Sequence, residues 1–343
     1  MKRLLLFTVL LLLVATGWAQ KPRKIMFYNL ENFFDTKRDP DIYDEEFTPE
    51  GVKKWNDAKY EKKLSNMERV FFDIAAMDKE YPTVIGVCEI ENRSILEDIV
   101  ATKKMAPANY RIVHHDSPDP RGVDVGFMYR PDVFRIEGEK AFRTVVPGMP
   151  NFRTRDILTM WGTIDKEQFL FMVAHWPSRL GGKDASEDKR IAVAEQMKEI
   201  ADSMVQVYPG MKVIAMGDFN DDPTDKSIAD GFDAKAKIKD VEDDDYFAPY
   251  AEMLKAGYGT LAYGDAWNIF DNMVVSSNLV NAEPGTFRLL KAPGSKYYGN
   301  IFRQPYLIQK EGQFKGYPLR TYVGNNFQGG FSDHLPVYIF IGK

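Results

Sequence analysis

The sequence has 343 residues, 44% of them hydrophobic, which supports a large buried core. Its formal net charge is −5, with 45 Lys and Arg against 50 Asp and Glu, and this argues against a protein that coats nucleic acid through a generally basic surface. The one cysteine, Cys88, excludes an intramolecular disulfide; it lies in an apolar run and is interpreted as a small buried residue.

The first residues have the layout of a secretory signal peptide. A basic start is followed by the largely apolar run 4–14, and small residues lead to an expected cleavage after Ala19. The run is shorter than the roughly 20 residues that span a bilayer. An uncleaved anchor is the alternative, ranked second because polar residues follow Ala19. We expect a mature chain of 343 − 19 = 324 residues, periplasmic or secreted, monomeric, without a membrane span, and folded as the single domain 20–343.

Strand-like segments dominate the predicted secondary structure. They are short and rich in β-branched and aromatic residues, which favours strands. Several are apolar at every position, which predicts strands covered on both faces. In chain order the segments are residues 24–29, 83–88, 110–114, 123–129, 157–163, 169–175, 212–216, 272–276 and 335–341.

Four helices are predicted from apolar residues recurring every three or four positions. We expect Asn56 or Asp57 to start the first, Ser94 to cap the second, and Asp184 with Glu187 to form a capping box for the third. Some neighbouring strands are too close in sequence for a crossover helix, so antiparallel pairs are expected. The simplest architecture is an α/β fold of two mixed sheets packed face to face with helices outside. The predicted helices cover residues 58–77, 95–104, 184–208 and 250–256.

The stretch 230–245 is polar and ends in a group of acidic residues. Such a stretch can form a calcium site or a solvated loop. The loop is favoured because the ligand spacing of a calcium loop is not met. The stretch belongs to a long insert, 222–263, which we expect to shape a cleft.

Six predicted strands meet polar residues at one end. Strand ends of an α/β sheet converge on a common crevice, and carboxylates, carboxamides and imidazoles are what hard divalent cations and phosphate chemistry require. One such strand end has a plain explanation, because strand ends reach solvent, but six in one chain indicate a site. The pieces are Tyr-Asn-Leu-Glu-Asn at 28–32, Cys-Glu at 88–89, His-Trp-Pro-Ser-Arg at 175–179, Gly-Asp-Phe-Asn at 217–220, Asp271, and Ser-Asp-His-Leu-Pro at 332–336.

In this order, the six pieces resemble those of the endonuclease/exonuclease/phosphatase superfamily. It includes deoxyribonuclease-I-like nucleases, abasic-site endonucleases, inositol polyphosphate 5-phosphatases and sphingomyelinases. The resemblance extends from Lys24 to Ile341. It implies a deoxyribonuclease-I-like fold, a four-layer α/β sandwich with the site at one end of the sheets.

The resemblance also implies a metal site. Glu89 would bind the ion, with Asn29 and Asp333 close to it. Mg²⁺ or Mn²⁺ is the expected cofactor, because such an ion prefers a few carboxylates and neutralises charge that develops on phosphate oxygens. A neutral carboxamide such as Asn29 can contribute without adding repulsion near the phosphate.

The catalytic roles implied by the resemblance fall on five residues. Asp218 would orient or deprotonate the attacking water, and Asn220 would hydrogen-bond the phosphate. His334 would contact the scissile phosphate and be oriented by Asp271, a pairing that fixes the tautomer and favours the cation. His175 lies where the nuclease branch has a second histidine. Alone, Asp218 and Asn220 would be read as an Asx-turn.

Other polar residues have weaker support. Arg93, Arg121 and Arg179 lie in polar loops beside the expected crevice and are candidates for gripping flanking phosphates; ordinary surface charge is the alternative for each. His114 and His115 belong to no motif and end a predicted strand, so they are left out of the site.

The sequence therefore predicts an exported hydrolase of phosphodiesters with direct attack by water, most simply a nuclease acting on DNA or RNA. The alternatives are a phosphomonoesterase or a lipid or inositol phosphodiesterase of the same superfamily. A non-catalytic binding module with the same fold is disfavoured because such a module has no need of the complete polar set. No nucleophile elbow or activated cysteine points to a covalent intermediate.

Overall fold

The computed structural model describes residues 21–343, so the expected signal peptide lies outside the described residues. Within 21–343, no helix is long and apolar enough to cross a membrane. The α-helices are α1 (Asp57–Ala76), α2 (Arg93–Ala101), α3 (Lys183–Val207), α4 (Ala251–Lys255) and α5 (Ser277–Val280). Short 3-10 helices occur at Glu45–Phe47, Ala106–Ala108, Ile238–Asp240 and Pro305–Leu307, and a π-helical turn occurs at Ser227–Gly231.

The first of two large sheets, sheet A, is mixed. Its strands β1 and β2 run parallel, and its remaining pairs are antiparallel. Its spatial order is β14 (Arg288–Leu290), β18 (Val337–Gly342), β1 (Arg23–Phe33), β2 (Val84–Ile90), β4 (Asp124–Tyr129) and β3 (Arg111–His114), with β15 (Asn300–Ile301) also paired to β18.

The second large sheet, sheet B, is also mixed, with parallel pairs at β7–β8 and β9–β10. Two small hairpins lie outside both sheets: β11 (Leu261–Tyr263) with β12 (Ala266–Asn268), and β16 (Tyr322–Val323) with β17 (Asn326–Phe327). The order in sheet B is β5 (Arg135–Phe142), β6 (Ile157–Ile164), β7 (Glu167–His175), β8 (Lys212–Asp218), β13 (Asp271–Ser276), β10 (Tyr246–Phe247) and β9 (Ala234–Lys235).

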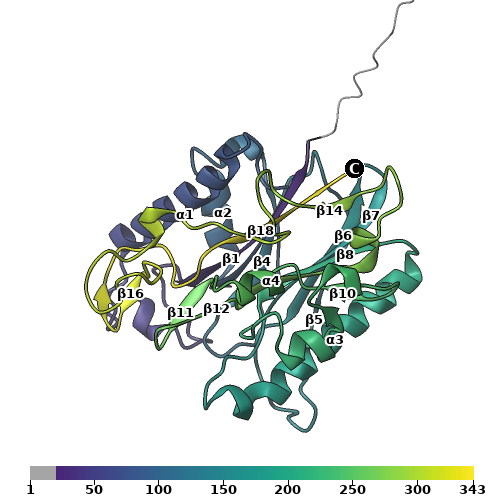
Figure 1. Ribbon diagram of the computed structural model, residues 1–343. Helices are drawn as coiled ribbons and strands as arrows, with labels where there is room; N and C mark the ends of the chain where they lie inside the picture. Colours follow the sequence, from purple (N-terminus) through teal and green to yellow (C-terminus); the bar gives the residue numbers. More distant parts are fainter. Residues whose placement is uncertain (1–20) are drawn as a thin grey trace, which may run out of the picture.

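The two sheets pack face to face through one apolar core. Ile25 and Phe127 of sheet A meet Phe171 and Ile214 of sheet B in this core. The outer face of sheet A packs on α1 and α2, and the outer face of sheet B packs on α3, which produces four layers (Figure 1). Each fully buried aliphatic or aromatic side chain contributes about 1.5–3 kcal/mol to folding. The predicted architecture is confirmed.

All nine predicted strands are present. Nine further strands among residues 21–343 were missed by the sequence pattern, and eight of them have only two or three residues. The longest missed strand is β5, which lies at the edge of sheet B, where its exposed polar residues match no apolar run. The stretch 230–245 is more ordered than the expected solvated loop, because it contains β9 and leads directly into β10, and these two strands extend sheet B.

Two of the predicted helix starts were wrong in detail. Asn92, not Ser94, caps α2, and its side chain accepts hydrogen bonds from the backbone N–H groups of Ser94 and Ile95. The third helix starts after Gly182 without a side-chain cap, so the predicted capping box is not used. Of the two residues expected to start α1, Asn56 is the cap, and its side chain accepts from the N–H of Lys59.

A buried glutamate beyond the end of β2 predicts a pH-dependent stability. Burial raises the pKa of Glu91 from 4.5 to about 8, and the charges of Asp35, Asp44 and Asp39 act in the same direction. Between these pH values the folded protein holds a proton that the unfolded chain has released, so this group destabilises the fold as pH rises. We expect Glu91→Gln to reduce the loss of unfolding free energy between pH 5 and pH 8 by about 1–3 kcal/mol.

Urea unfolding at the two pH values measures this effect. Glu97→Gln, on the exposed face of α2, is the matched control and should leave the pH dependence as in the wild type. An equal loss in Glu91→Gln and wild type would contradict the assignment.

Candidate active site

The register of sheet B places three of the predicted residues side by side. In the parallel pair β7–β8, His175 lies opposite Asp218, and in the antiparallel pair β8–β13, Asp218 lies opposite Asp271. All three are buried. The three residues therefore form a row across neighbouring strands, although they come from distant parts of the sequence.

Sheet A brings Asn29 and Glu89 to the same end of the molecule. Asn29 is opposite Cys88 in the parallel pair β1–β2, and the next residue along β2 is Glu89. At Glu89 the register between β2 and β4 shifts, and the backbone is left-handed with φ 58°. Such a bulge redirects a side chain at the edge of a site.

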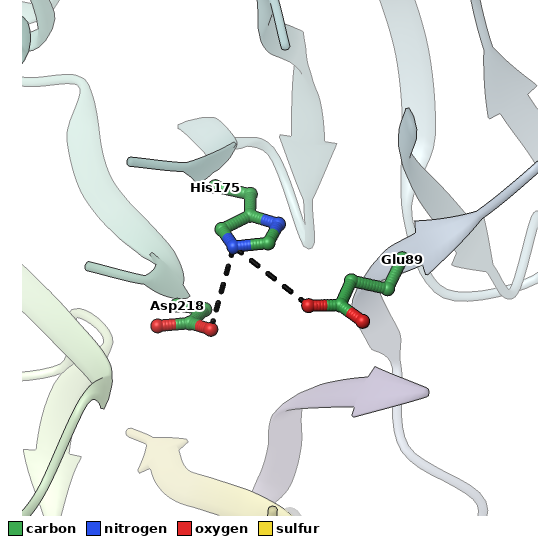
Figure 2. Close-up of side chains that lie close together, drawn as sticks. All are labelled: Glu89, His175 and Asp218. Atoms are coloured by element: carbon green, nitrogen blue, oxygen red, sulfur yellow. Dashed lines mark ion pairs between the residues drawn. The ribbon is translucent and has the colours of Figure 1, made fainter. Parts of the chain in front are cut away.

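Glu89, His175 and Asp218 form a compact cluster (Figure 2). The Nε2 atom of His175 lies 3.5 Å from Oδ2 of Asp218 and 3.9 Å from Oε1 of Glu89. One ligand atom from each of the three side chains lies within 4.8 Å of the others. Two carboxylates and one imidazole at this spacing suit a divalent cation.

Asn29 connects the two carboxylates of this cluster. Its Nδ2 donates to Oδ2 of Asp218 at 3.0 Å and to Oε1 of Glu89 at 3.2 Å. Its Oδ1 accepts from the N–H of Glu31 at 2.8 Å. The hydrogen bonds thus give Asn29 the position of a bridge, and its direct ligation of a metal stays a prediction.

His334 and Asp271 are in contact. Nδ1 of His334 lies 2.7 Å from Oδ2 of the fully buried Asp271, which leaves Nε2 directed toward Asp218 at 3.7 Å. Ser332 fixes this segment, because its hydroxyl donates to the carbonyl of Asn29 and accepts from the N–H of His334. The Ser-Asp-His piece therefore ties the start of the last strand to β1.

Burial and neighbouring charges shift the pKa values of the ionisable side chains at the site in different directions. Burial raises the pKa of Asp218 to about 7, helped by Asp271 and Glu89 and opposed by His334. Burial opposes the charged form of His334, but Asp271 and Asp218 outweigh it and raise its pKa well above the ordinary value. Burial lowers the pKa of His175 well below its ordinary value. One histidine is held as a cation and the other as a neutral imidazole.

Four of the twelve non-glycine residues with left-handed backbone in the described part of the chain belong to the motifs of the site. Besides Glu89, they are Glu31 with φ 50°, Asn32 with φ 44° and Asn220 with φ 52°. Non-glycine residues in this region are strained, and they often mark functional positions. Gly217 meets a different constraint: a Cβ there would lie 2.0 Å from the carbonyl oxygen of Ala174, so only glycine fits before Asp218.

Asn220 and Arg179 support the strand end that carries Asp218. The N–H of Asn220 donates to Oδ1 of Asp218, forming the Asx-turn, and its side-chain amide donates to the carbonyl of Trp176. Arg179 donates to the carbonyl of Asn220 and pairs with Asp221 and Asp225. These contacts hold the guanidinium of Arg179 on its own loop, and a role in substrate binding stays a prediction.

The other two predicted arginines differ in position. Arg121 lies close enough for its charge to lower the pKa of His175, after burial and the charge of Arg155. Its Nε lies 3.5 Å from Oδ1 of Asp119, and its side chain is 50% exposed, so the rest of the guanidinium is accessible to an anion. Arg93 begins α2 and pairs with Glu97, and no described contact joins it to the cluster of Glu89, His175 and Asp218.

Sequence reasoning gave no role to Arg155. This buried guanidinium pairs with Asp119 at 2.8 Å and donates to the carbonyl oxygens of His175 and Trp176. It therefore fixes the end of β7 against the loop before β4. The only signal in the sequence was its position in a polar segment between predicted strands.

Asp333 lies beside this cluster, not within it. Its Oδ2 is 3.2 Å from Arg320, and its Oδ1 is 3.9 Å from Nε2 of His334. It borders a pocket of about 240 Å³ that Glu31, Arg320 and Lys53 also line. Burial and the charge of Asp333 raise the pKa of Glu31 to about 7. Asp333 as a metal ligand stays a prediction.

A family model for the Endonuclease/Exonuclease/phosphatase family matches residues 24–343, so the chain belongs to this family. Its members are metal-dependent phosphoester hydrolases, and the acidic cluster of this chain fits that class. No curated protein matches the chain.

Solved structures share the fold at low sequence identity. Truncated TDP2 of Caenorhabditis elegans is 13% identical, with TM-score 0.55 and 94% of this chain and 98% of that chain covered. TDP2 of D. rerio, solved with a single-strand DNA product, is 14% identical, with TM-score 0.54 and coverages of 94% and 99%. A mannosyl-6-phosphatase of Bacteroides thetaiotaomicron is 17% identical, with TM-score 0.50 and coverages of 93% and 99%. These likenesses establish the deoxyribonuclease-I-like fold.

Proposed function

We propose that the protein is a divalent-metal-dependent phosphodiesterase that uses direct attack by water, with nucleic acid as its first substrate class. One observation carries the proposal: Asp218 lies within 4 Å of both a neutral histidine, His175, and a cationic histidine, His334. The carboxylate of Asp218 can accept a proton from water while the cationic His334 beside it donates to the phosphate, and hydrolysis of a phosphate ester requires such a pair of a base and an acid.

The roles follow from these protonation states. Asp218, with a raised pKa, accepts a proton from the attacking water and orients it. His334 presents Nε2–H to a phosphate oxygen, and Asp271 keeps that proton in place through Nδ1. Asn220 uses one amide N–H on Trp176, and its second N–H is assigned to the phosphate.

The carboxylates of the site, without the imidazole of His175, fit a hard divalent cation that prefers oxygen ligands. Glu89 would hold Mg²⁺ or Mn²⁺ together with a carboxylate oxygen of Asp218, and Asp333 supplies a further carboxylate at the same end of the sheets. A bound cation would neutralise charge that develops on the phosphate oxygens. His175 is neutral and therefore adds no positive charge that would compete for the ion.

No covalent intermediate is proposed. Cys88 is fully buried, and burial raises the pKa of its thiol well above the ordinary value, which keeps it protonated and unreactive.

The substrate is assigned from the chemistry of the site. His175 is the feature that the nuclease resemblance implied, and the half-exposed Arg121 beside it suits a flanking phosphate. The acidic net charge of −5 fits a hydrolase with few phosphate contacts. A phosphomonoesterase is the second candidate, because the family includes phosphatases and the mannosyl-6-phosphatase has the same fold.

Glu89→Gln tests the dependence on metal. We expect wild type to cleave at least one substrate in Mg²⁺ or Mn²⁺ and to lose that activity in EDTA. The variant should need at least about 10–100-fold more metal for half-maximal rate. The panel contains plasmid DNA, RNA, bis-p-nitrophenyl phosphate, p-nitrophenyl phosphate, mannose 6-phosphate and sphingomyelin.

Glu97→Gln, an exposed residue of α2, is the matched control and should behave as wild type. Cleavage of DNA or RNA supports the nuclease, and cleavage of monoesters alone supports the phosphatase. Failure on every substrate, by a folded protein that binds no Mg²⁺ or Mn²⁺, would replace the enzyme with a binding module.

Export is proposed from the first residues of the sequence. Secretion into the periplasm or medium with an N-terminus at Gln20 is the expected result, and N-terminal sequencing of protein expressed from the full chain measures it. Retention of residues 1–19 would favour the uncleaved anchor.

A further inference from the structure

A second cluster of possible metal ligands lies on the hairpin of β3 and β4, apart from Glu89, His175 and Asp218. It contains His114 at the end of β3, Asp124 at the start of β4 and Asp116 in the loop between them. One ligand atom from each lies within 4.8 Å of the others. This cluster is not used by the proposed reaction.

The strand register explains why these residues meet. His114 lies opposite Gly126 in the antiparallel pair β3–β4. The ladder ends at this pair; Asp116 follows His114 by two residues in the loop, and Asp124 precedes Gly126 by two residues at the start of β4. Because side chains alternate between the two faces of a sheet, residues two apart lie on the same face. The three side chains are therefore gathered by the hairpin itself.

The imidazole of His114 is a buried group without a hydrogen bond. Its side chain is 3% exposed, and its Nε2 has no hydrogen-bond partner. Nε2 lies 3.2 Å from Oδ2 of Asp124, with a geometry that forms no hydrogen bond. Nitrogen and oxygen ligands of a tetrahedral Zn²⁺ ion, each about 2.0–2.2 Å from the metal, are separated by roughly 3.3 Å. The observed separation thus suits a shared ion.

The carboxylate of Asp124 is already oriented for this use. Its Oδ1 accepts from both the N–H and the hydroxyl of Ser117, and this leaves Oδ2 directed to His114. Outer hydrogen bonds of this kind hold a ligating carboxylate in place. Asp116 is 89% exposed, and its Oδ1 lies 3.9 Å from Nδ1 of His114. Its free carboxylate would turn toward Nε2 to complete the site from the solvent side.

We propose that His114, Asp116 and Asp124 bind a Zn²⁺ ion in a site separate from the catalytic cluster. A nitrogen ligand with two carboxylates favours Zn²⁺ over Mg²⁺, which prefers oxygen ligands alone. Three protein ligands leave the fourth position to water.

The site would close the loop that joins β3 to β4. This loop carries Asp119, which pairs with Arg155, and Arg155 donates to the carbonyl of His175. It also carries Arg121, the arginine assigned to a flanking phosphate. An ion that fixes both ends of the loop would therefore position an edge of the active site without taking part in the reaction.

Zinc content measured by equilibrium dialysis in excess Mg²⁺ tests the proposal. We expect His114→Asn to bind one Zn²⁺ per chain fewer than wild type. His115→Asn, the same change at the exposed neighbouring residue, should bind as wild type. His175→Asn alters the catalytic cluster and should keep the ion at His114. In this last variant, added Zn²⁺ should still raise the melting temperature.

Equal zinc content in His114→Asn and wild type would overturn the proposal. If His114→Asn does not fold, Asp116→Asn replaces it, because its exposed side chain carries no core packing. We expect that variant to weaken zinc binding about tenfold or more. An unchanged affinity there would overturn the proposal as well.

Discussion

Replacing Asp218 with Asn is expected to slow phosphodiester hydrolysis by roughly 10²–10⁴-fold without unfolding the protein. Asparagine has nearly the same volume and keeps an oxygen that can accept from the N–H of Asn220. It cannot take a proton from water. The loss should therefore appear in kcat, and the melting temperature should change little.

The pH profile separates this role from a merely structural one. The carboxylate form of Asp218 is required, so the rate of wild type should rise with pH through its pKa, which burial raises to about 7. A bound cation favours the charged form and would move this rise to lower pH. The rise should vanish in Asp218→Asn. Asp184→Asn, on the exposed start of α3, is the control. A variant that keeps the wild-type profile would remove Asp218 from the mechanism.

The second large effect concerns the buried pair of Asp271 and His334. We expect Asp271→Asn to lower kcat by roughly 10²–10⁴-fold, because asparagine can neither fix the histidine tautomer nor stabilise its cation. The rate of wild type should fall as pH rises through the pKa of His334, which Asp271 and Asp218 raise against the effect of burial. Without the Asp271 charge this pKa is lower, so the fall should begin at lower pH.

A double-mutant cycle tests whether the two residues act as one unit. His334→Gln should cost at least as much as Asp271→Asn, and the double variant should be little worse than His334→Gln alone. Additive losses of activity would show that Asp271 acts elsewhere than through His334.

The sequence predicted the fold well where strands are buried. Segments such as 169–175 and 212–216 are apolar at nearly every position because the core and a helix cover both faces. The same rule failed at β5, whose edge position leaves polar side chains exposed. Capping was harder: Asn92 and Ser94 are equally good caps by residue type, and the choice between them depends on where β2 ends.

The sequence predicted which residues lie at the site more completely than it predicted the contacts between them. Local motifs located Glu89, Asp218 and His334, and the structure brings these three together. The pattern could not reveal that Asn29 directs its amide nitrogen at two carboxylates, since that depends on pairing across 189 residues of sequence. The role of Arg155 could not be predicted either, because two of its three partners are backbone carbonyls, which every residue possesses.

The left-handed backbone at Glu89 also bears on how this protein can change under selection. Glycine would relieve the strain there, yet it would remove the carboxylate on which metal binding is proposed to depend. Asn220 presents the same conflict, because its side-chain amide is assigned to the phosphate. Glycine at these positions would raise the thermal stability but remove groups that the proposed reaction needs. Stabilising substitutions that preserve activity should therefore lie on the exposed surfaces of the helices.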